Sequence, residues 1–151
     1  MEHLKLSVMT IEDYPEVSAL WNTIRGFAIR SVDDSYEGVR RFLLRNPSTS
    51  VVARMGGEVV GAVLCGHDGR RGCFYHVCVR EQFRRKGIGK AMVLFCVDAL
   101  RKESISKISL IAFTSNDAGN AFWKEIGWQQ RSDLNTYDFV LNEENKVHFN
   151  P

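Results

Sequence analysis

The sequence lacks a long hydrophobic run, and this shortage bounds where the protein can act. No apolar segment approaches the ~18–20 residues of a membrane-spanning helix. The N-terminal residues also lack the apolar stretch of a signal peptide. We therefore expect a cytoplasmic protein without a membrane partner. The net charge of only +2 over 151 residues is too small to indicate a nucleic-acid partner.

Cysteine is also scarce, and the four that occur show no paired spacing. Cys65, Cys73, Cys78 and Cys96 lie in segments expected to be strands or a helix, which predicts small buried apolar residues rather than disulfide bonds. Cys73, His76 and Cys78 together could suggest zinc. Because side chains alternate between the two faces of a strand, we expect Cys73 and His76 on opposite faces and predict no metal site.

The apolar residues that are present suffice for one domain. With 44% hydrophobic residues, the chain can bury a full core over residues 1–142, and 143–151 are expected to be a loose polar tail. Periodicity predicts strands at 4–9, 50–55, 58–65, 73–79, 106–113, 128–131 and 135–141. Helices are predicted to begin at Thr10 and at Asp33 or Asp34, and to span 87–102 and 118–126. This order predicts a mixed α/β sheet with helices on both faces.

A basic, glycine-rich turn is the most informative segment. Residues 84–89 read Arg-Arg-Lys-Gly-Ile-Gly, between the apolar run 74–79 and an apolar helix pattern. In a strand–turn–helix arrangement, backbone N–H groups point outward and the helix N-terminus adds partial positive charge. Glycine also lets an anion approach closely. The turn therefore predicts a phosphate or pyrophosphate site, with a solvated basic turn at a helix start as the alternative.

Two other phosphate-binding motifs do not fit this turn. A P-loop requires Gly-x4-Gly-Lys-Ser/Thr, but Arg84 stands at the first glycine position and Ala91 at the hydroxyl position. A dinucleotide fingerprint requires Gly-x-Gly-x-x-Gly, and counting from Gly87 places Met92 at the last glycine. What remains is Arg-x-x-Gly-x-Gly with two additional cations.

A second set of residues follows the expected strand 106–113. In chain order, this set is Asn116, Gly119, Phe122, Trp123 and Gly127-Trp128. Together with the turn, this spacing resembles the GNAT superfamily of N-acetyltransferases, which use acetyl-CoA. The resemblance implies a mostly antiparallel central sheet of about seven strands with helices on both faces. It also implies that the strand 73–79 splays away from the strand that follows the next helix.

The resemblance implies which residues hold acetyl-CoA. The backbone of Val77, Cys78 and Val79 is expected to bind the pantetheine arm where the sheet splays. The turn is expected to hold the pyrophosphate through its amides and cations, at Arg84, Arg85, Lys86, Gly87, Ile88, Gly89 and Lys90. The residues implied beside the cofactor further along the chain are Asn116, Gly119, Phe122 and Trp123. The alternative for these last residues is an ordinary strand end and ordinary helix packing.

The family's catalytic roles cannot be assigned directly to residues of this chain, because the chain departs from the family pattern. Trp123 stands where the family usually has a tyrosine that protonates the departing thiolate, and Gly119 stands where alanine is usual. Where some relatives carry a glutamate base, this chain has Cys73 and Ile111. His76 is the nearest candidate base on the central strand. Proton transfer through ordered water is the alternative.

These expectations lead to an N-acetyltransferase that transfers the acetyl group of acetyl-CoA directly to an amine, without a metal ion. The acceptor is either a small molecule or a protein N-terminus. The alternative outside the enzymes is a CoA-binding regulatory module without efficient turnover. Acceptor contacts are expected from the first two helices and from the last hairpin turn, at Trp21, Arg25, Phe27 and Leu134-Asn135. The sequence leaves a homodimer open.

Overall fold

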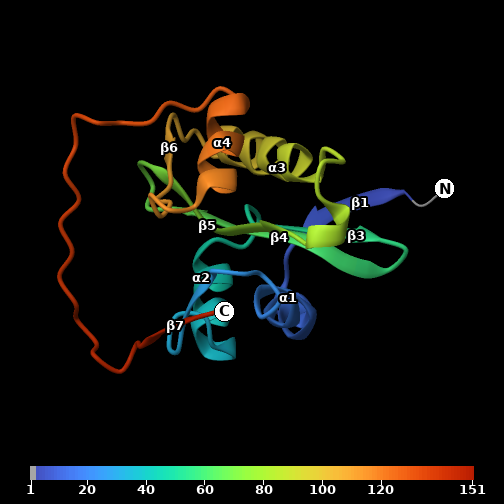
Figure 1. Cartoon of the computed structure of the whole chain (residues 1–151), viewed down its shortest axis with the longest axis horizontal. Coiled ribbons are helices and arrows are strands. Elements are labelled where there is room, and N and C mark those ends of the chain that lie inside the picture. The colour runs from blue at the N-terminus through green and yellow to red at the C-terminus, as the bar shows by residue number, and fades with distance from the viewer. Residues whose placement is uncertain (1–2) are drawn as a thin grey trace.

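A computed structural model describes residues 3–151 and contains a five-stranded sheet between two helical layers (Figure 1). The strands, in spatial order, are β1 (Leu4–Val8), β3 (Val51–Met55), β4 (Glu58–His67), β5 (Gly72–Val79) and β6 (Ile108–Ser109). Neighbouring strands pair antiparallel except β5 and β6, which are parallel. The predicted mixed and mostly antiparallel sheet is therefore confirmed.

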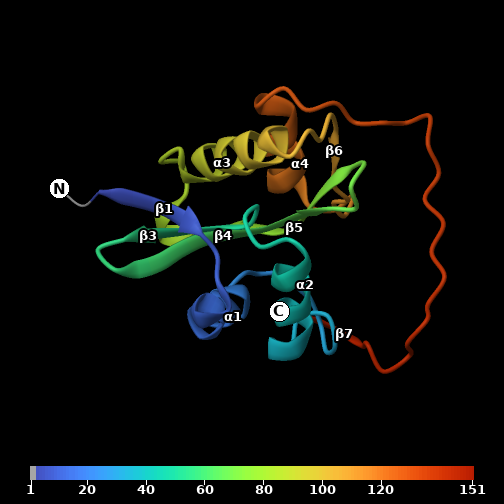
Figure 2. The same ribbon diagram turned by 180° about the vertical axis from the view of Figure 1, so that it is seen from behind.

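Two helices cover each face of the sheet (Figures 1 and 2). The helices α1 (Tyr14–Trp21) and α2 (Tyr36–Arg45) lie on one face, and α3 (Ile88–Lys102) and α4 (Asp117–Glu125) on the other. Single helical turns, η1 (Ile11–Asp13) and η2 (Glu81–Phe83), precede α1 and α3. Apolar residues of β4 point alternately into two cores, so that Val59 packs with α1 and Val60 with α3. Burial on both faces explains why β4 reads as a continuous apolar run.

The last two predicted strands do not form in this sheet. Every residue from 129 to 144 is exposed, and the chain runs there as a wide arc outside the body (Figure 1). The chain then returns as β7 (Val147–Phe149), which pairs antiparallel with β2 (Ala28–Arg30) in a separate two-stranded sheet. The strands therefore divide five and two rather than forming one sheet of seven.

The polar tail is attached to the body rather than loose. Asn145 Oδ1 accepts hydrogen bonds from the amides of Val32 and Asp33, at 3.0 and 3.1 Å. Asn150 Nδ2 donates to the carbonyls of Trp21 and Ile24, both at 2.8 Å. The tail thus satisfies carbonyls at the end of α1 and fixes the connection between α1 and α2.

The second helix begins later than predicted. Ser35 is its N-cap, and its hydroxyl accepts a hydrogen bond from the Gly38 amide at 3.1 Å. Asp34 therefore precedes the helix, and it is buried. Among residues 3–151, no helix combines the length and apolar character needed to span a membrane.

Candidate functional site

The predicted splay lies between β5 and β6. These strands pair only through Gly72 with Ile108 and Cys73 with Ser109, although β5 continues to Val79. Beyond Cys73, the edge of β5 that leads away from β4 has no strand partner in the described chain. Residues 77–79 lie in this unpaired stretch, whose backbone groups can bind an extended ligand.

The basic turn has the backbone of an anion site. Gly87 is the N-cap of α3 with φ of 80°, and Arg85 is also left-handed with φ of 63°. The first helical bond runs from the Ala91 amide to the Gly87 carbonyl at 3.0 Å. The amides of residues 88–90 precede that bond, so they have no acceptor within the helix. No side chain among residues 3–151 caps this helix end. The free amides and the positive end of the helix dipole therefore lie together at the N-terminus of α3.

The cations of the turn have different roles. Arg84 Nε donates to the Val79 carbonyl at 3.0 Å, which ties the turn back to β5. Arg85 and Lys90 are exposed, and Lys86 is also exposed with its Nζ 5.4 Å from the centre of the Phe83 ring. The Arg84 side chain thus shapes the turn, and the other three cations are available to a polyanion.

The start of α4 explains one departure from the family pattern. Asn116 is the N-cap of α4, and its Oδ1 accepts from the Gly119 amide at 3.0 Å. A Cβ atom at position 119 would lie 2.4 Å from Asn116 Nδ2, so alanine would displace this cap. A Cβ atom at Gly89 would lie 3.3 Å from the Phe122 ring. Gly89 therefore lets α4 approach the basic turn closely, whereas Gly119 leaves room for the Asn116 cap. The cofactor role of Asn116 stays a prediction.

Trp123 belongs to an aromatic cluster beneath α4. Its ring centre lies 4.7 Å from Trp128, 5.0 Å from Phe122 and 6.1 Å from Phe74 of β5. These contacts place the Trp123 ring between its own helix, α4, and strand β5. Phe122 of the same helix lies next to the turn at Gly89. The ring contacts support the packing role over an acid role, because an indole N–H can donate a hydrogen bond but is not an acid near neutral pH.

His76 sits on a bulge that interrupts β5. Ala62 faces Cys78 and Leu64 faces Tyr75, so His76 and Val77 together oppose one residue of β4. His76 has a left-handed backbone with φ of 51°. The sequence analysis assumed that side chains alternate strictly between the two faces of β5. The bulge breaks this alternation, so two side chains expected on opposite faces can lie on the same face.

The predicted separation of Cys73 and His76 on opposite faces is therefore wrong. The Tyr75 ring contacts Phe42 of α2, and the His76 ring contacts Trp21 of α1, both on the same side of the sheet. Cys73 shares a hydrogen bond with Tyr75, which together with burial raises the pKa of Tyr75 to about 12. Tyr75 is therefore protonated at neutral pH and is not a base. Within the described residues, no group of three His, Cys, Asp or Glu side chains is arranged to hold a metal ion.

The sequence did not reveal the acidic partner of His76. Asp34 Oδ1 lies 2.9 Å from His76 Nε2, and Asp34 Oδ2 accepts from the Arg30 amide at 2.7 Å. The His76 ring is packed against Trp21 and Phe27, each with its ring centre 4.8 Å away. With Nε2 donating to the carboxylate, Nδ1 is the nitrogen that can accept a proton. A histidine oriented by a buried carboxylate is the arrangement of a general base.

The remaining candidates divide between the site and the surface. Of the predicted acceptor contacts, Phe27 lies beside His76, Trp21 is buried beneath it, and Arg25 is exposed. Leu134-Asn135 lies in the exposed arc, apart from these residues (Figure 1). Ile111, at one of the positions where relatives carry a glutamate, is 84% exposed.

Three of the four cysteines are buried packing residues, as predicted, and Cys73 is not. Cys65, Cys78 and Cys96 are buried, Cys73 is half-buried, and all four are free thiols. Burial raises the pKa of Cys78 to about 12, and the hydrogen bond to Cys65 together with burial raises the pKa of Cys96. Cys78 and Cys96 are therefore not nucleophiles near neutral pH.

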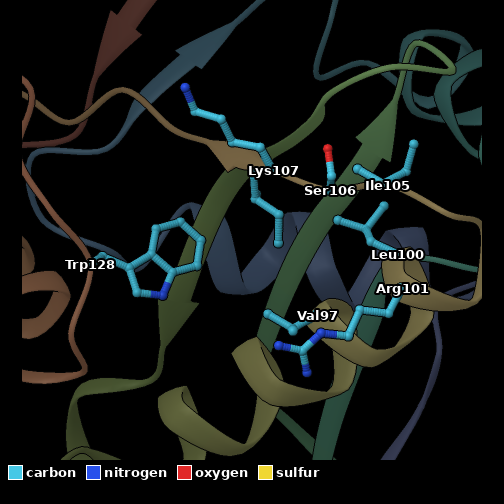
Figure 3. A pocket seen from close by; sticks show the side chains of 8 residues that line it. Val97, Leu100, Arg101, Ile105, Ser106, Lys107 and Trp128 are labelled. Carbon is cyan, nitrogen blue, oxygen red and sulfur yellow. The ribbon is translucent and has the colours of Figure 1, made fainter.

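A shallow hollow of about 200 Å³ lies at the other end of α3 from the turn (Figure 3). Its lining residues are Val97, Leu100, Arg101, Ile105, Ser106, Lys107, Ile108 and Trp128. The hollow is separated from Gly87 by most of the length of α3. It is therefore distinct from the basic turn. It is also distinct from His76, whose ring packs against Trp21 of α1 on the other face of the sheet.

Comparisons with known proteins agree with this geometry. The Acetyltransferase (GNAT) family model matches residues 14–128. An acetyltransferase of Sodalis glossinidius is 28% identical over 131 residues, which cover 87% of this chain and 91% of that protein. This relative extends the similarity beyond the turn and the α4 segment to almost the whole chain.

Solved structures share the fold. PaiA N-acetyltransferase of Thermoplasma acidophilum, in complex with coenzyme A, superposes with a TM-score of 0.75 and 13% identity over 96% of each chain. A ribosomal-protein-alanine N-acetyltransferase of Brucella melitensis biovar Abortus 2308 superposes with a TM-score of 0.66 and 21% identity, over 92% of this chain and 100% of that chain. The family model covers more than half of the sequence, so this chain belongs to the GNAT acetyltransferase family.

Proposed function

We propose that the protein is an acetyl-CoA-dependent N-acetyltransferase that transfers the acetyl group directly to an amine. One observation carries this proposal: the strand β5 leads into the anion turn and also presents His76 at its bulge. The strand has an unpaired edge beyond Cys73. A thioester held along this strand and an amine held beside His76 would therefore meet at the bulge.

The residues of the chain would divide the chemistry among them. The amides of residues 88–90 and the exposed cations of the turn bind the pyrophosphate, and the unpaired edge of β5 aligns the extended arm. Acetyl-CoA supplies the thioester carbonyl that the amine attacks. His76 Nδ1 takes the proton that the amine loses, and Asp34 stabilises the imidazolium that results. A free thiol has a pKa near 8.5, so the thiolate can leave without an acid.

A base matters most for a strongly basic acceptor. Deprotonating a lysine-like amine at pH 7 costs roughly 4–5 kcal/mol, whereas an α-amine costs about 1–1.5 kcal/mol. The His76–Asp34 pair supports either acceptor class, a small-molecule amine or a protein N-terminus. The solved structures with the same fold include a ribosomal-protein-alanine N-acetyltransferase and an aminoglycoside N-acetyltransferase, so the fold fits both classes. The cytoplasmic location remains the expectation from sequence.

An acceptor panel tests the proposal. Acetyl-CoA is incubated with the protein and with polyamines, amino sugars and short peptides that have free N-termini, and release of the CoA thiol is followed. We expect release with at least one amine above the rate without acceptor. If CoA binds but no amine accelerates release, the protein is a CoA-binding regulatory module instead.

The anion turn makes a prediction of its own. Gly87→Glu places a carboxylate where phosphate is proposed to bind, in a position with no atom within 4 Å of the added Cβ. We expect acetyl-CoA affinity to fall at least tenfold, about 1.4 kcal/mol, in titration calorimetry. Gly69→Glu is the matched control, because Gly69 also has positive φ and empty surroundings but lies between β4 and β5. Equal affinities in the two folded variants would refute the phosphate site.

A further inference from the structure

The hollow at the C-terminal end of α3 is formed by the way in which that helix ends. Ser104 has a left-handed backbone with φ of 63°, and its amide donates to the Arg101 carbonyl at 3.0 Å. The Ile105 amide donates to the Leu100 carbonyl at 3.1 Å. These two bonds make a Schellman motif, which commonly brings an apolar contact between the residues at the positions of Ile105 and Leu100. The chain therefore turns back beside α3, and residues 105–108 line one side of the hollow.

The floor of the hollow is apolar. Leu100 and Ile105 are buried, and Val97 and Ile108 are partly buried against the same core. Trp128 closes another side, and its ring is fixed by the aromatic cluster beneath α4. The volume of about 200 Å³ equals roughly seven waters of the bulk liquid. The hollow therefore has the size for a small organic molecule with an apolar body.

The charged side chains of this hollow have one sign. Among its lining residues that the structure describes, Arg101 and Lys107 are the charged ones. Lys102, next along α3, pairs with Asp98 at 3.2 Å, whereas no carboxylate of residues 3–151 forms an ion pair with Arg101. Figure 3 shows the Arg101 guanidinium extending toward the side that Trp128 occupies, with the Lys107 ammonium at the rim. A guanidinium without a carboxylate thus lies beside an apolar floor.

We propose that this hollow binds a small organic carboxylate whose apolar body is about the size of benzoate. Arg101 holds the carboxylate through parallel N–H groups, which is the geometry in which a guanidinium binds this group best. The apolar body covers Leu100 and Ile105 and lies against the Trp128 ring. Lys107 adds positive potential at the rim, which favours the approach of an anion. The proposal does not depend on the proposed activity.

Two other ligand classes use only part of this site. Inorganic phosphate would pair with Arg101 but would leave the apolar floor in water. A neutral aromatic molecule would cover the floor but would leave the guanidinium without an anion. The carboxylate with an apolar body uses both features, because burial of apolar surface and a charge-assisted hydrogen bond then add in one ligand.

Calorimetric titration of the full chain separates these classes. Benzoate carries the charge and the apolar body, benzyl alcohol lacks the charge, and acetate and inorganic phosphate lack the body. We expect saturable binding of one benzoate per chain, and at least tenfold weaker binding of the other three molecules. Absence of saturable benzoate binding overturns the proposal, and so does equal affinity for any of the other three.

Three variants show where the carboxylate binds. Arg101→Gln is expected to weaken benzoate binding at least tenfold. Arg41→Gln is the matched control, because Arg41 is also an exposed arginine, on α2 at the other face of the sheet. Gly87→Glu, which adds a negative charge to the basic turn, should leave benzoate affinity unchanged. If Gly87→Glu abolishes benzoate binding while Arg101→Gln keeps it, the anion binds the turn and the proposal is wrong.

Nuclear magnetic resonance of the indole N–H groups gives an independent location. Trp128 lines the hollow, whereas Trp21 is buried on the other face of the sheet. We expect benzoate to shift the Trp128 signal, which the Trp128→Phe variant assigns, and to leave the Trp21 signal in place. A Trp128 signal that does not move at saturating benzoate would overturn the proposed site, even if calorimetry detects binding.

Discussion

Replacing His76 by alanine is expected to lower turnover by roughly 10²-fold or more, as loss of a general base does. The reason is the pairing of His76 Nε2 with buried Asp34 at 2.9 Å, which orients the ring and leaves Nδ1 to accept a proton. The acidic limb of the pH–rate profile should disappear with the side chain. Acetyl-CoA affinity should change little, because the proposed phosphate contacts lie on the turn before α3. Steady-state kinetics across pH and titration calorimetry measure the two effects separately.

Two further variants sharpen this test. His76→Asn keeps a residue type that tolerates the left-handed backbone of the bulge, so it separates loss of the base from backbone strain. His67→Ala is the matched control, because His67 also pairs with a carboxylate, Glu103, at 2.9 Å, but at the far end of β4. Near-normal turnover of His76→Ala, with the same acidic limb, would leave proton transfer to water.

Trp123→Ala is expected to lower conformational stability and acetyl-CoA affinity by a combined ~3 kcal/mol or more, as large aromatic truncations do. Trp123 touches Phe74, Phe122 and Trp128, and Phe122 packs near Gly89 at the start of α3. Removing the indole would therefore loosen α4 and also the turn that it supports. Chemical denaturation and titration calorimetry give the two contributions.

Trp123→Phe distinguishes packing from proton donation at the same position. A flat ring is kept, so we expect turnover within about tenfold of the wild-type value. If this variant binds acetyl-CoA normally yet has lost turnover, the indole N–H takes part in catalysis and the packing role alone is inadequate.

The basic turn before α3 could be predicted from sequence because its residues are close together in the chain, and its role as an anion site stays a prediction. Two glycines, three consecutive cations and an apolar helix pattern lie within a few residues of one another. The structure adds that Arg84 Nε donates a hydrogen bond to the Val79 carbonyl at 3.0 Å. That contact joins positions only five apart, but it depends on where β5 ends, which periodicity places only to within a few residues.

The acid partner of His76 could not be predicted in the same way. The sequence analysis places a helix start at Asp33 or Asp34, because aspartate is a good N-cap. The structure gives the cap to Ser35 and turns Asp34 toward the bulge of β5. Asp34 and His76 are 42 positions apart in the sequence, and they come together only because α1 and α2 pack on the sheet.

The sequence by itself determined the family, the mixed sheet with helices on both faces, and the basic turn that leads into α3, because these rest on local periodicity and on short motifs. Tertiary structure alone decided which strands have partners. Residues 135–141 show the alternation of a strand, yet alternation specifies a backbone conformation and a buried face, not a neighbour. Pairing is a long-range choice, and here it joined 147–149 to β2 and left 135–141 exposed. The same long-range packing placed Asp34 beside His76.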